Sequence, residues 1–467
     1  MNRINSLPKI TTPIPGPNSK LYLNRLLDME APSLTLNDSS LSIIWEKTSG
    51  MNVFDVDGNK YLDYASGLNV ANVGHTNQEV VDAAKEQLNV MLQGMGDFHA
   101  NKRKIEFLEK VLEIVPIKNS KAIVSVNGSD AVDAALKTAT LYTGKRGFLS
   151  FYGAYHGMGA KSLEVTARHH FRAPFSNEIP RSTTFLPYPY CYRCPFSKNN
   201  NDCVMDCLKN VEQTIENTAS GSDDIGAIII ESFQGRGGVV QAPPAFLKGL
   251  REICDRNGIL LIVDEILSGF GRTGKWFGFE HAGIEPDIVT IGKGLSSGYP
   301  ISACVGKASV MDVWKKFEGE SVHTSTFQGN PVGSVLATSS INYIQKNSLI
   351  EQSNEKGQYF KNRLIELIGN HQNVGEIRGK GLMIGIEFVK NKKTKEPDAE
   401  LCWEVMRRSL QKGMILLNGG HQVNVLCLTP PLIIKYEEID FCIDTLKSVL
   451  EDLTNHKANN FEKGHIN

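Results

Sequence analysis

The sequence predicts an α/β protein with two domains. The larger is expected to contain a mostly parallel central sheet with helices on both faces, and the smaller to be α+β. Between residues 76 and 335, short apolar and β-branched runs alternate with segments of helical periodicity, as parallel strands joined by helices require. From 336 to 455, a long helical segment leads into further strands and a closing amphipathic helix.

Six segments are expected to be strands of the large domain: 122–126, 147–151, 227–230, 259–263, 288–291 and 301–305. Each is a short apolar run between polar or turn-forming residues, which is typical of strands that are buried on both faces. Ligands of such sheets bind beyond the carboxyl ends of the strands. Functional residues are therefore expected directly after these segments.

The rest of the chain is expected to form the smaller domain and its surroundings. Residues 1–75 are predicted to be an N-terminal arm that joins the small domain through a hairpin over 53–64, with Asp57 and Gly58 in the turn. The closing helix carries apolar residues at spacings of four, three and four, namely Ile439, Ile443, Leu446 and Leu450. The polar residues 456–467 are predicted to be a disordered tail.

Composition excludes several classes of function. The 467 residues include 50 Lys and Arg against 51 Asp and Glu, so the net charge favours neither nucleic acid nor a membrane surface as a partner. The longest apolar runs are far shorter than a membrane-spanning helix, and the N-terminus lacks the apolar core of a secretory signal. Nine cysteines, an odd number, do not suggest a disulfide framework. We expect a cytoplasmic protein that acts on small molecules.

Two predicted strands end in residues that together suggest covalent chemistry. Asp264 follows one strand, and Lys293, between two glycines, follows another. Alone, the Asp would be a helix cap or surface ion pair, and the Lys a solvated amine. Together they meet the needs of pyridoxal 5′-phosphate (PLP): an amine that forms a Schiff base, and a carboxylate that keeps the pyridine nitrogen protonated. Lys293 and Asp264 are the predicted catalytic residues.

Two further strand ends could hold the rest of such a cofactor. Gly128 and Ser129 open a helix after strand 122–126, where free N–H groups would bind a phosphate. Alternatively, Ser129 is simply a helix cap. Tyr155 follows the next strand and could stack on one face of a planar ring while Ile266 covers the other. An exposed loop tyrosine is the alternative there.

The order and spacing of these motifs resemble the class III (ornithine, GABA or ω-type) aminotransferases of PLP fold type I. The likeness covers about residues 40–450. It rests on the ordered set Gly128-Ser129-Asp130-Ala131, Gly153 to Gly157, Glu231 with Gln234-Gly235, Asp264-Glu265-Ile266, Gly269 to Gly274, Gly292-Lys293-Gly294, Ser325-Thr326-Phe327 and Arg378-Gly379.

The resemblance implies a role for each matching residue. Lys293 would form the Schiff base and carry the proton at the substrate's α-carbon, and Asp264 would pair with the ring nitrogen. The implied cofactor-binding set is Gly128, Ser129, Tyr155, His156, Glu231, Gln234, Asp264, Ile266, Lys293 and Thr326. Thr326 would reach the phosphate from a neighbouring subunit, which implies a homodimer with shared active sites. Arg378 would bind a substrate carboxylate.

This sequence departs from the family pattern on the side of the site where the substrate is expected to bind. Where many relatives have an acid after the Gln-Gly pair, this chain has Arg236. Either Arg378 therefore stays available, or Arg236 itself binds an anionic substrate group, or Arg236 is merely solvated. A second departure is Cys427, at a position where relatives often have an arginine.

Four cysteines lie in a Pro- and Asn-rich stretch: Cys191, Cys194, Cys203 and Cys207. Their spacing is compatible with zinc or an iron–sulfur cluster. The favoured interpretation is free thiols on a surface loop, with no metal in the chemistry.

The expected activity is transamination by a ping-pong mechanism, from an amino acid or amine donor to a 2-oxo acid acceptor, with PLP as cofactor. The alternative on the same fold is an amino-acid racemase or 2-epimerase, because the same carbanion can be reprotonated without transfer of the amine. A non-catalytic scaffold organised around the cysteines is the least favoured reading.

Overall fold

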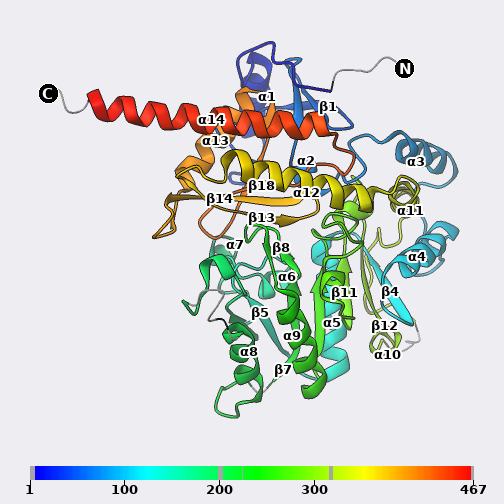
Figure 1. Cartoon of the computed structure of the whole chain (residues 1–467). Helices are drawn as coiled ribbons and strands as arrows, with labels where there is room; N and C mark the ends of the chain where they lie inside the picture. Colours follow the sequence, from blue (N-terminus) through cyan, green and yellow to red (C-terminus); the bar gives the residue numbers. More distant parts are fainter. Residues whose placement is uncertain (1–5, 198–202, 204, 223, 315–318, 464–467) are drawn as a thin grey trace.

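The computed structural model describes residues 6–197, 203, 205–222, 224–314 and 319–463, with side chains through residue 455. A seven-stranded sheet with its helices forms the large domain, and smaller sheets with the N- and C-terminal helices lie at one end of it (Figure 1). No helix in this described part of the chain combines the length and apolar character needed to cross a bilayer.

The large sheet has the strand order β4-β12-β11-β10-β7-β5-β6. Its strands are β4 (Ser120–Ser125), β5 (Gly147–Phe151), β6 (Thr183–Leu186), β7 (Ile225–Glu231), β10 (Leu260–Asp264), β11 (Ile288–Ile291) and β12 (Ser302–Lys307). The five strands from β11 to β6 are parallel, and β12 runs antiparallel to both of its neighbours. The predicted mostly parallel sheet is confirmed.

The register of the strands brings the predicted catalytic residues together at the carboxyl edge of the sheet. Asp264 at the end of β10 pairs with Glu231 of β7 on one side and with Thr290 of β11 on the other. Lys293 comes three residues after Thr290. The sheet therefore delivers two carboxylates and an amine to neighbouring positions.

Both faces of the sheet are buried, as the sequence predicted. Along β10, Leu260 and Ile262 belong to one apolar cluster, while Leu261 and Val263 belong to another. The first cluster includes side chains from α5 (Gly128–Thr143) and α10 (Ala308–Met311). The second includes side chains from α4 (Lys102–Ile114), α8 (Asp206–Glu216), α9 (Pro244–Asn257) and α11 (Pro331–Lys346). Alternate residues of each strand thus face opposite helical layers.

The smaller domain contains the antiparallel strands β13 (Val374–Lys380), β14 (Met383–Asn391), β17 (Leu417–Gly419) and β18 (Val425–Leu428). Helices α12 (Leu349–Ile368), α13 (Ala399–Gln411) and α14 (Tyr436–Lys463) cover it. On α14 the four predicted apolar residues are buried.

The N-terminal region joins this domain through strand pairing. The predicted hairpin forms from β2 (Asn52–Asp55) and β3 (Lys60–Asp63), and β1 (Trp45–Ser49) extends it. Strand β16 (Met414–Ile415) pairs with β3, so the two ends of the chain share a sheet. In the arm, which the structure describes from residue 6, helix α1 spans Pro17–Leu27.

The predicted disordered tail differs from the structure, in which α14 continues to Lys463. Residues 451–463 contain neither Gly nor Pro, so nothing in them stops the helix. Residues 464–467 lie outside the described part.

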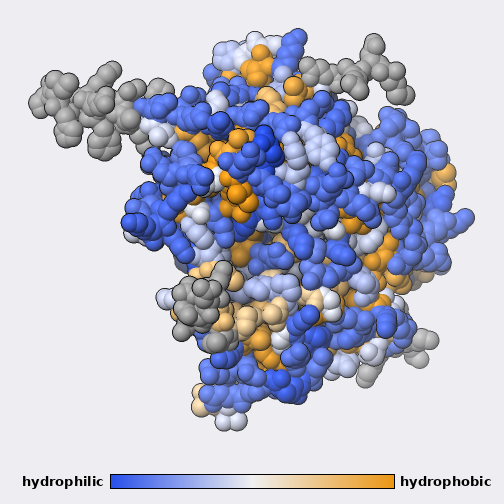
Figure 2. Space-filling view, viewed as in Figure 1, coloured by the Kyte–Doolittle hydropathy of each residue, from blue (hydrophilic) through white to orange (hydrophobic). Residues whose placement is uncertain are grey.

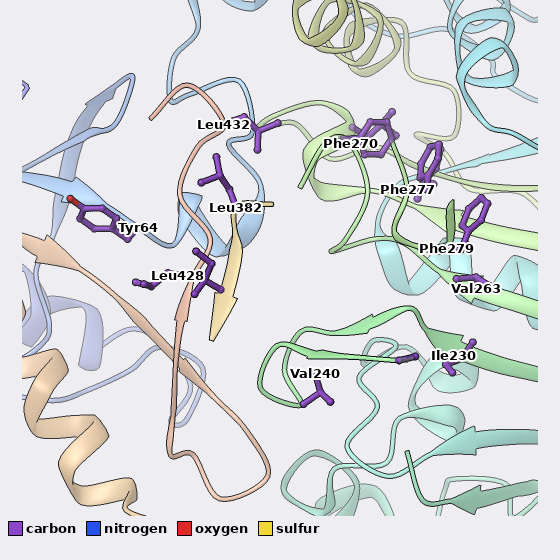
Figure 3. Packing of buried hydrophobic residues seen from close by; sticks show 14 of the residues in the cluster. Tyr64, Ile230, Val240, Val263, Phe270, Phe277, Phe279, Leu382, Leu428 and Leu432 are labelled. Atoms are coloured by element: carbon purple, nitrogen blue, oxygen red, sulfur yellow. The ribbon is translucent and has the colours of Figure 1, made fainter. Parts of the chain in front are cut away.

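One apolar cluster connects the two domains. Figure 3 follows it from Leu428 and Leu382 of the small domain to Phe270, Phe277 and Phe279 of the large one. In the middle of this junction lies Arg272, which is fully buried. Its guanidinium donates to the carbonyls of Leu382 (3.1 Å) and Pro430, and to Asn72 Oδ1 (2.7 Å).

Candidate active site

A cavity of about 220 Å³ opens at the carboxyl edge of the large sheet. Its walls come from the ends of four strands and from the first turn of α5. They consist of Asn127, Gly128, Ser129, Tyr155, His156, Gly157, Glu231, Arg236, Asp264, Ile266, Leu267 and Lys293. The structure thus brings together eight of the ten predicted cofactor-binding residues.

Asp264 is held firmly at the base of this cavity. It is 4% exposed, its Oδ2 lies 2.7 Å from Nδ1 of the buried His156, and its Oδ1 accepts from the Ile266 N–H at 3.0 Å. Nε2 of the same His156 is buried without a hydrogen-bond partner among the described residues. The imidazole therefore fixes the orientation of the carboxylate.

Lys293 sits on a short 3₁₀ turn directly after β11, with a positive φ of 45°. Burial lowers the pKa of its ammonium, while the carboxylates of Asp264 and Glu231 act in the opposite direction. The glycine after it is required, because a Cβ on Gly294 would lie 2.4 Å from Asn72 Nδ2. Because its pKa is lowered, the Lys293 amine loses its proton more easily here than in water.

Glu231 lies next to Asp264 and is also buried. Its two carboxylate oxygens accept from the Tyr155 N–H (3.1 Å) and the Gly235 N–H (2.9 Å). Burial raises its pKa to about 7, and the nearby charge of Asp264 acts in the same direction. The carboxyl therefore ties the loops after β5 and β7 together.

The first turn of α5 forms the opposite wall. Asn127, not Ser129, caps this helix, and its side chain accepts from the Asp130 N–H at 3.1 Å. Ser129 Oγ accepts from the Met158 N–H at 3.1 Å. A Cβ on Gly128 would lie 3.0 Å from Ile266 Cδ1, so a larger residue would close the cavity.

These features fit PLP. A held carboxylate and a lysine whose pKa is lowered by burial line the same cavity, and a capped helix begins at its edge. An aromatic and a branched aliphatic side chain, Tyr155 and Ile266, also line it. These are the groups that the amine, ring and phosphate chemistry of this cofactor requires.

Comparison with known proteins decides the family. The family model "Aminotransferase class-III" matches residues 35–450. The chain belongs to the class III aminotransferase family. It is accordingly a PLP-dependent enzyme of fold type I.

Its relatives in this family differ in activity. A leucine/methionine racemase from Thermococcus litoralis is 36% identical over 88% of this chain and 91% of its own length. The 4-aminobutyrate aminotransferase GabT of Escherichia coli is 34% identical over 85% and 91%. An aminotransferase structure from Bacillus anthracis has a TM-score of 0.86 at 33% identity, covering 93% of this chain and 99% of its own.

Two predicted cofactor-binding residues of this class III enzyme lie outside the cavity. The Gln234 side chain turns away, donates to the Tyr152 carbonyl at 2.9 Å, and lines a neighbouring cavity of about 170 Å³. Thr326 is exposed on the surface, where its carbonyl accepts from Gln93 at 2.7 Å. Within one chain, Thr326 does not reach the site.

The two predicted substrate-binding arginines have very different surroundings. Arg236 lines the cavity beside Lys293. Arg378 does not, because its guanidinium binds Glu376 (2.7 Å), Glu387 (2.6 Å) and the Gly238 carbonyl (2.5 Å). Burial alone would lower the pKa of Arg378, but Tyr190 and these two carboxylates hold it above its usual range. The arginine that the family pattern singles out is thus already saturated.

Residues near the site that the sequence did not single out are Arg168 and Phe171. They lie in a short irregular and helical segment after α6 (Ala160–Val165). The Phe171 ring contacts the Tyr155 ring at 5.2 Å and lies 6.0 Å from the Arg236 guanidinium. No motif marks this segment, so only its place in the fold brings it to the cavity.

The cysteine stretch forms no recognisable metal site. Within the described residues, no group of three or more His, Cys, Asp or Glu side chains is arranged to bind a metal. Cys191 and Cys203 are exposed thiols and Cys207 is buried at the start of α8. Arg193, between the first two cysteines, pairs with Glu387 and so links this stretch to the small domain.

Proposed function

We propose that this enzyme transfers an amino group from an amino acid or amine donor to a 2-oxo acid in two half-reactions. The observation that carries the proposal is the shared cavity of Lys293 and Asp264. PLP, when bound, supplies an aldehyde for the donor amine and a ring that accepts electrons from the donor's α-carbon. Lys293, whose pKa burial lowers, removes and returns the proton at that carbon.

The other residues hold the reactants. Asp264, oriented by His156, would face the pyridine nitrogen, and its negative charge keeps that nitrogen protonated. Gly128 and Ser129, at the first turn of α5, would hold the phosphate, with Tyr155 and Ile266 on the two faces of the ring. Glu231 would lie at the ring's edge, where it braces the loops that carry Tyr155 and Gly235.

A second candidate is an amino-acid racemase or 2-epimerase. Two observations favour it: the 36% identity to a leucine/methionine racemase, and the saturated Arg378. A dicarboxylate acceptor needs a second carboxylate site, which an arginine bound to two glutamates does not offer. A racemase needs only one substrate.

Deuterium incorporation separates the two. The holoenzyme is incubated with one enantiomer of an amino acid in deuterated water, with and without a 2-oxo acid such as pyruvate. A transaminase forms the new amino acid only when the acceptor is present. Deuterated mirror-image product in the absence of any acceptor would instead establish racemisation and reject the first proposal.

We also propose a homodimer with shared active sites. Figure 2 shows apolar surface on the side of the molecule where α3 (Gln78–Val90), α4 and α11 lie. The exposed large apolar side chains of this region are Leu88, Val90, Leu92, Met95, Phe98, Ile105, Val322 and Phe327. Burying such a surface is favourable. Thr326 lies within it, which supports a role at the partner's phosphate. Sedimentation of wild type and of Phe327→Glu would test this, since only the variant should yield monomer.

A cytoplasmic location is part of the same proposal. All nine cysteines are present as free thiols, seven of them buried or partly buried within the fold. Thiols persist in a reducing compartment.

A further inference from the structure

Two arginines meet at the mouth of the active-site cavity. Arg236, on the loop after β7, lines the cavity itself. Arg168 Nη1 donates to the Arg236 carbonyl at 2.6 Å, and its Nη2 donates to the Gly420 carbonyl at 3.4 Å. Both guanidiniums lie against the same Phe171 ring, at 5.8 and 6.0 Å from its centre. The aromatic ring and the backbone therefore hold the two cations side by side.

Within the described part of the chain, neither guanidinium has a direct ion-pair partner, although the charge of Glu231 in the same cavity acts on Arg168. Among the described residues, no carboxylate lies within 4 Å of either guanidinium. Both side chains are partly buried, and burial together with the charge of Arg236 lowers the pKa of Arg168. Two partly buried cations next to a catalytic amine are unfavourable unless the site receives an anion.

Arg378 offers a direct contrast within the same molecule. Its guanidinium is bound by two carboxylates and two backbone carbonyls, and its side chain lies over the Tyr190 ring at 4.9 Å. Releasing it for a substrate would leave Glu387, whose side chain is 1% exposed, without this partner. Glu387 would then keep Arg193 and Tyr190 as partners but lose this ion pair, so moving Arg378 away from it is unfavourable.

We propose that Arg236, positioned by Arg168, binds the α-carboxylate of the substrate in place of Arg378. This inference rests on the proposed amino-acid chemistry and deepens it. Because the cavity offers one such cationic group besides the lysine, the preferred substrates are α-amino acids with a single carboxylate and an uncharged side chain. The matching acceptor, for transamination, is a 2-oxo monocarboxylate.

The test compares an amino acid with the amine that lacks its carboxylate. Holoenzyme is titrated with L-norvaline and with n-butylamine, and the change of the cofactor's visible absorbance gives the half-saturating concentration of each. Arg236→Gln is expected to raise the half-saturating concentration of norvaline by roughly 10- to 100-fold, as the loss of a hydrogen-bonded charge does. The half-saturating concentration of butylamine should not change. Calorimetric titration with butanoate, which cannot react, should show binding to wild type and none to Arg236→Gln.

Arg168 has its own readout. Arg168→Gln should raise the half-saturating concentration of norvaline relative to that of butylamine, but by less than Arg236→Gln does. In this variant Arg236 keeps its charge and loses only the support that Arg168 gives its backbone. Arg168→Lys should restore part of the ratio. A structural role alone would move both ligands equally and would contradict the assignment.

Other outcomes overturn the proposal. One is that Arg378→Gln selectively loses norvaline binding while Arg236→Gln does not. The other is that Arg236→Gln releases PLP and binds both ligands equally weakly. The retained absorbance of bound PLP serves as the check of folding in each variant. If wild type responds to neither amine, the proposed function fails, whereas the butanoate titration still reports on the anion site separately.

Discussion

At the scale of single residues, the proposed chemistry depends on Lys293, whose surroundings favour the neutral amine more than water does. Its pKa is lowered by burial, although two carboxylates nearby oppose the shift. Burial therefore dominates at this position. The positive φ of Lys293 places the side chain off the line of β11 and into the cavity.

Replacing Lys293 by Ala should abolish the yellow absorbance that a PLP–lysine linkage gives. Turnover should fall by roughly 10²- to 10⁴-fold, because the variant lacks the base that moves the α-proton. The measurement is the visible spectrum of purified protein together with the rate. Lys275→Ala, at an exposed position, is the matched control and should retain both. A yellow Lys293→Ala protein would contradict the assignment.

Glu231 makes stability depend on pH. Its pKa is about 7 in the folded protein against an ordinary value of 4.5, so folding takes up a proton between these values. The free energy of unfolding of the apoprotein should therefore fall as pH rises through this window, by an amount on the order of 3 kcal/mol. Urea unfolding of wild type and Glu231→Gln at several pH values tests this. Equal slopes for the two proteins would show that Glu231 does not titrate there.

The sequence predicted the residues at strand ends better than those on irregular loops. Asp264, Lys293, Glu231 and Tyr155 all line the cavity, because the carboxyl edge of a parallel sheet fixes where strand ends point. Gln234 lies beyond the end of β7 on the short hairpin β8–β9 (Phe233–Gln234 and Val240–Gln241), whose direction no periodicity reveals. No motif or periodicity in the sequence marks Arg168.

At the scale of elements, the start of α5 both lines the cavity and carries the helix cap. Gly128 and Ser129 of its first turn line the cavity, and the Asn127 side chain caps that turn by accepting from the Asp130 N–H. Asn127→Ala should lower the free energy of unfolding by about 0.5–2 kcal/mol. Asn77→Ala, which removes the cap of α3, should cost a similar amount. Only the first variant should also lose PLP on dialysis; equal retention in both would argue against a phosphate site at α5.

The strands were predictable because their residues are apolar on both faces, as in Ile288–Ile291. The direction of β12 was not. Its apolar run resembles that of a parallel strand, but the chain turns back after Lys293 through Gly298 and Tyr299 without a crossover helix, so β12 enters antiparallel. The end of α14 was also missed, because a polar composition does not by itself stop a helix.

At the scale of the whole molecule, Arg272 holds the two domains together. Burial lowers its pKa to about 9, and its partners are carbonyl and amide oxygens from separate parts of the chain. Arg272→Met would leave those acceptors unpaired and should lower the free energy of unfolding by roughly 3–5 kcal/mol. Urea unfolding measures it. Arg256→Met, at a surface ion pair with Glu212 and Glu216, should leave the midpoint almost unchanged.

The Arg236 carbonyl accepts from Arg168 in the large domain and also from the Gly420 N–H in the small domain, at 3.0 Å. The residues proposed to hold the cofactor, by contrast, all belong to the large domain. Weakening the Gly420–Arg236 hydrogen bond between the domains would therefore raise the amino-acid concentration needed for half-saturation while PLP stays bound. Selectivity for reactants and retention of the prosthetic group are thus separately tunable in this molecule.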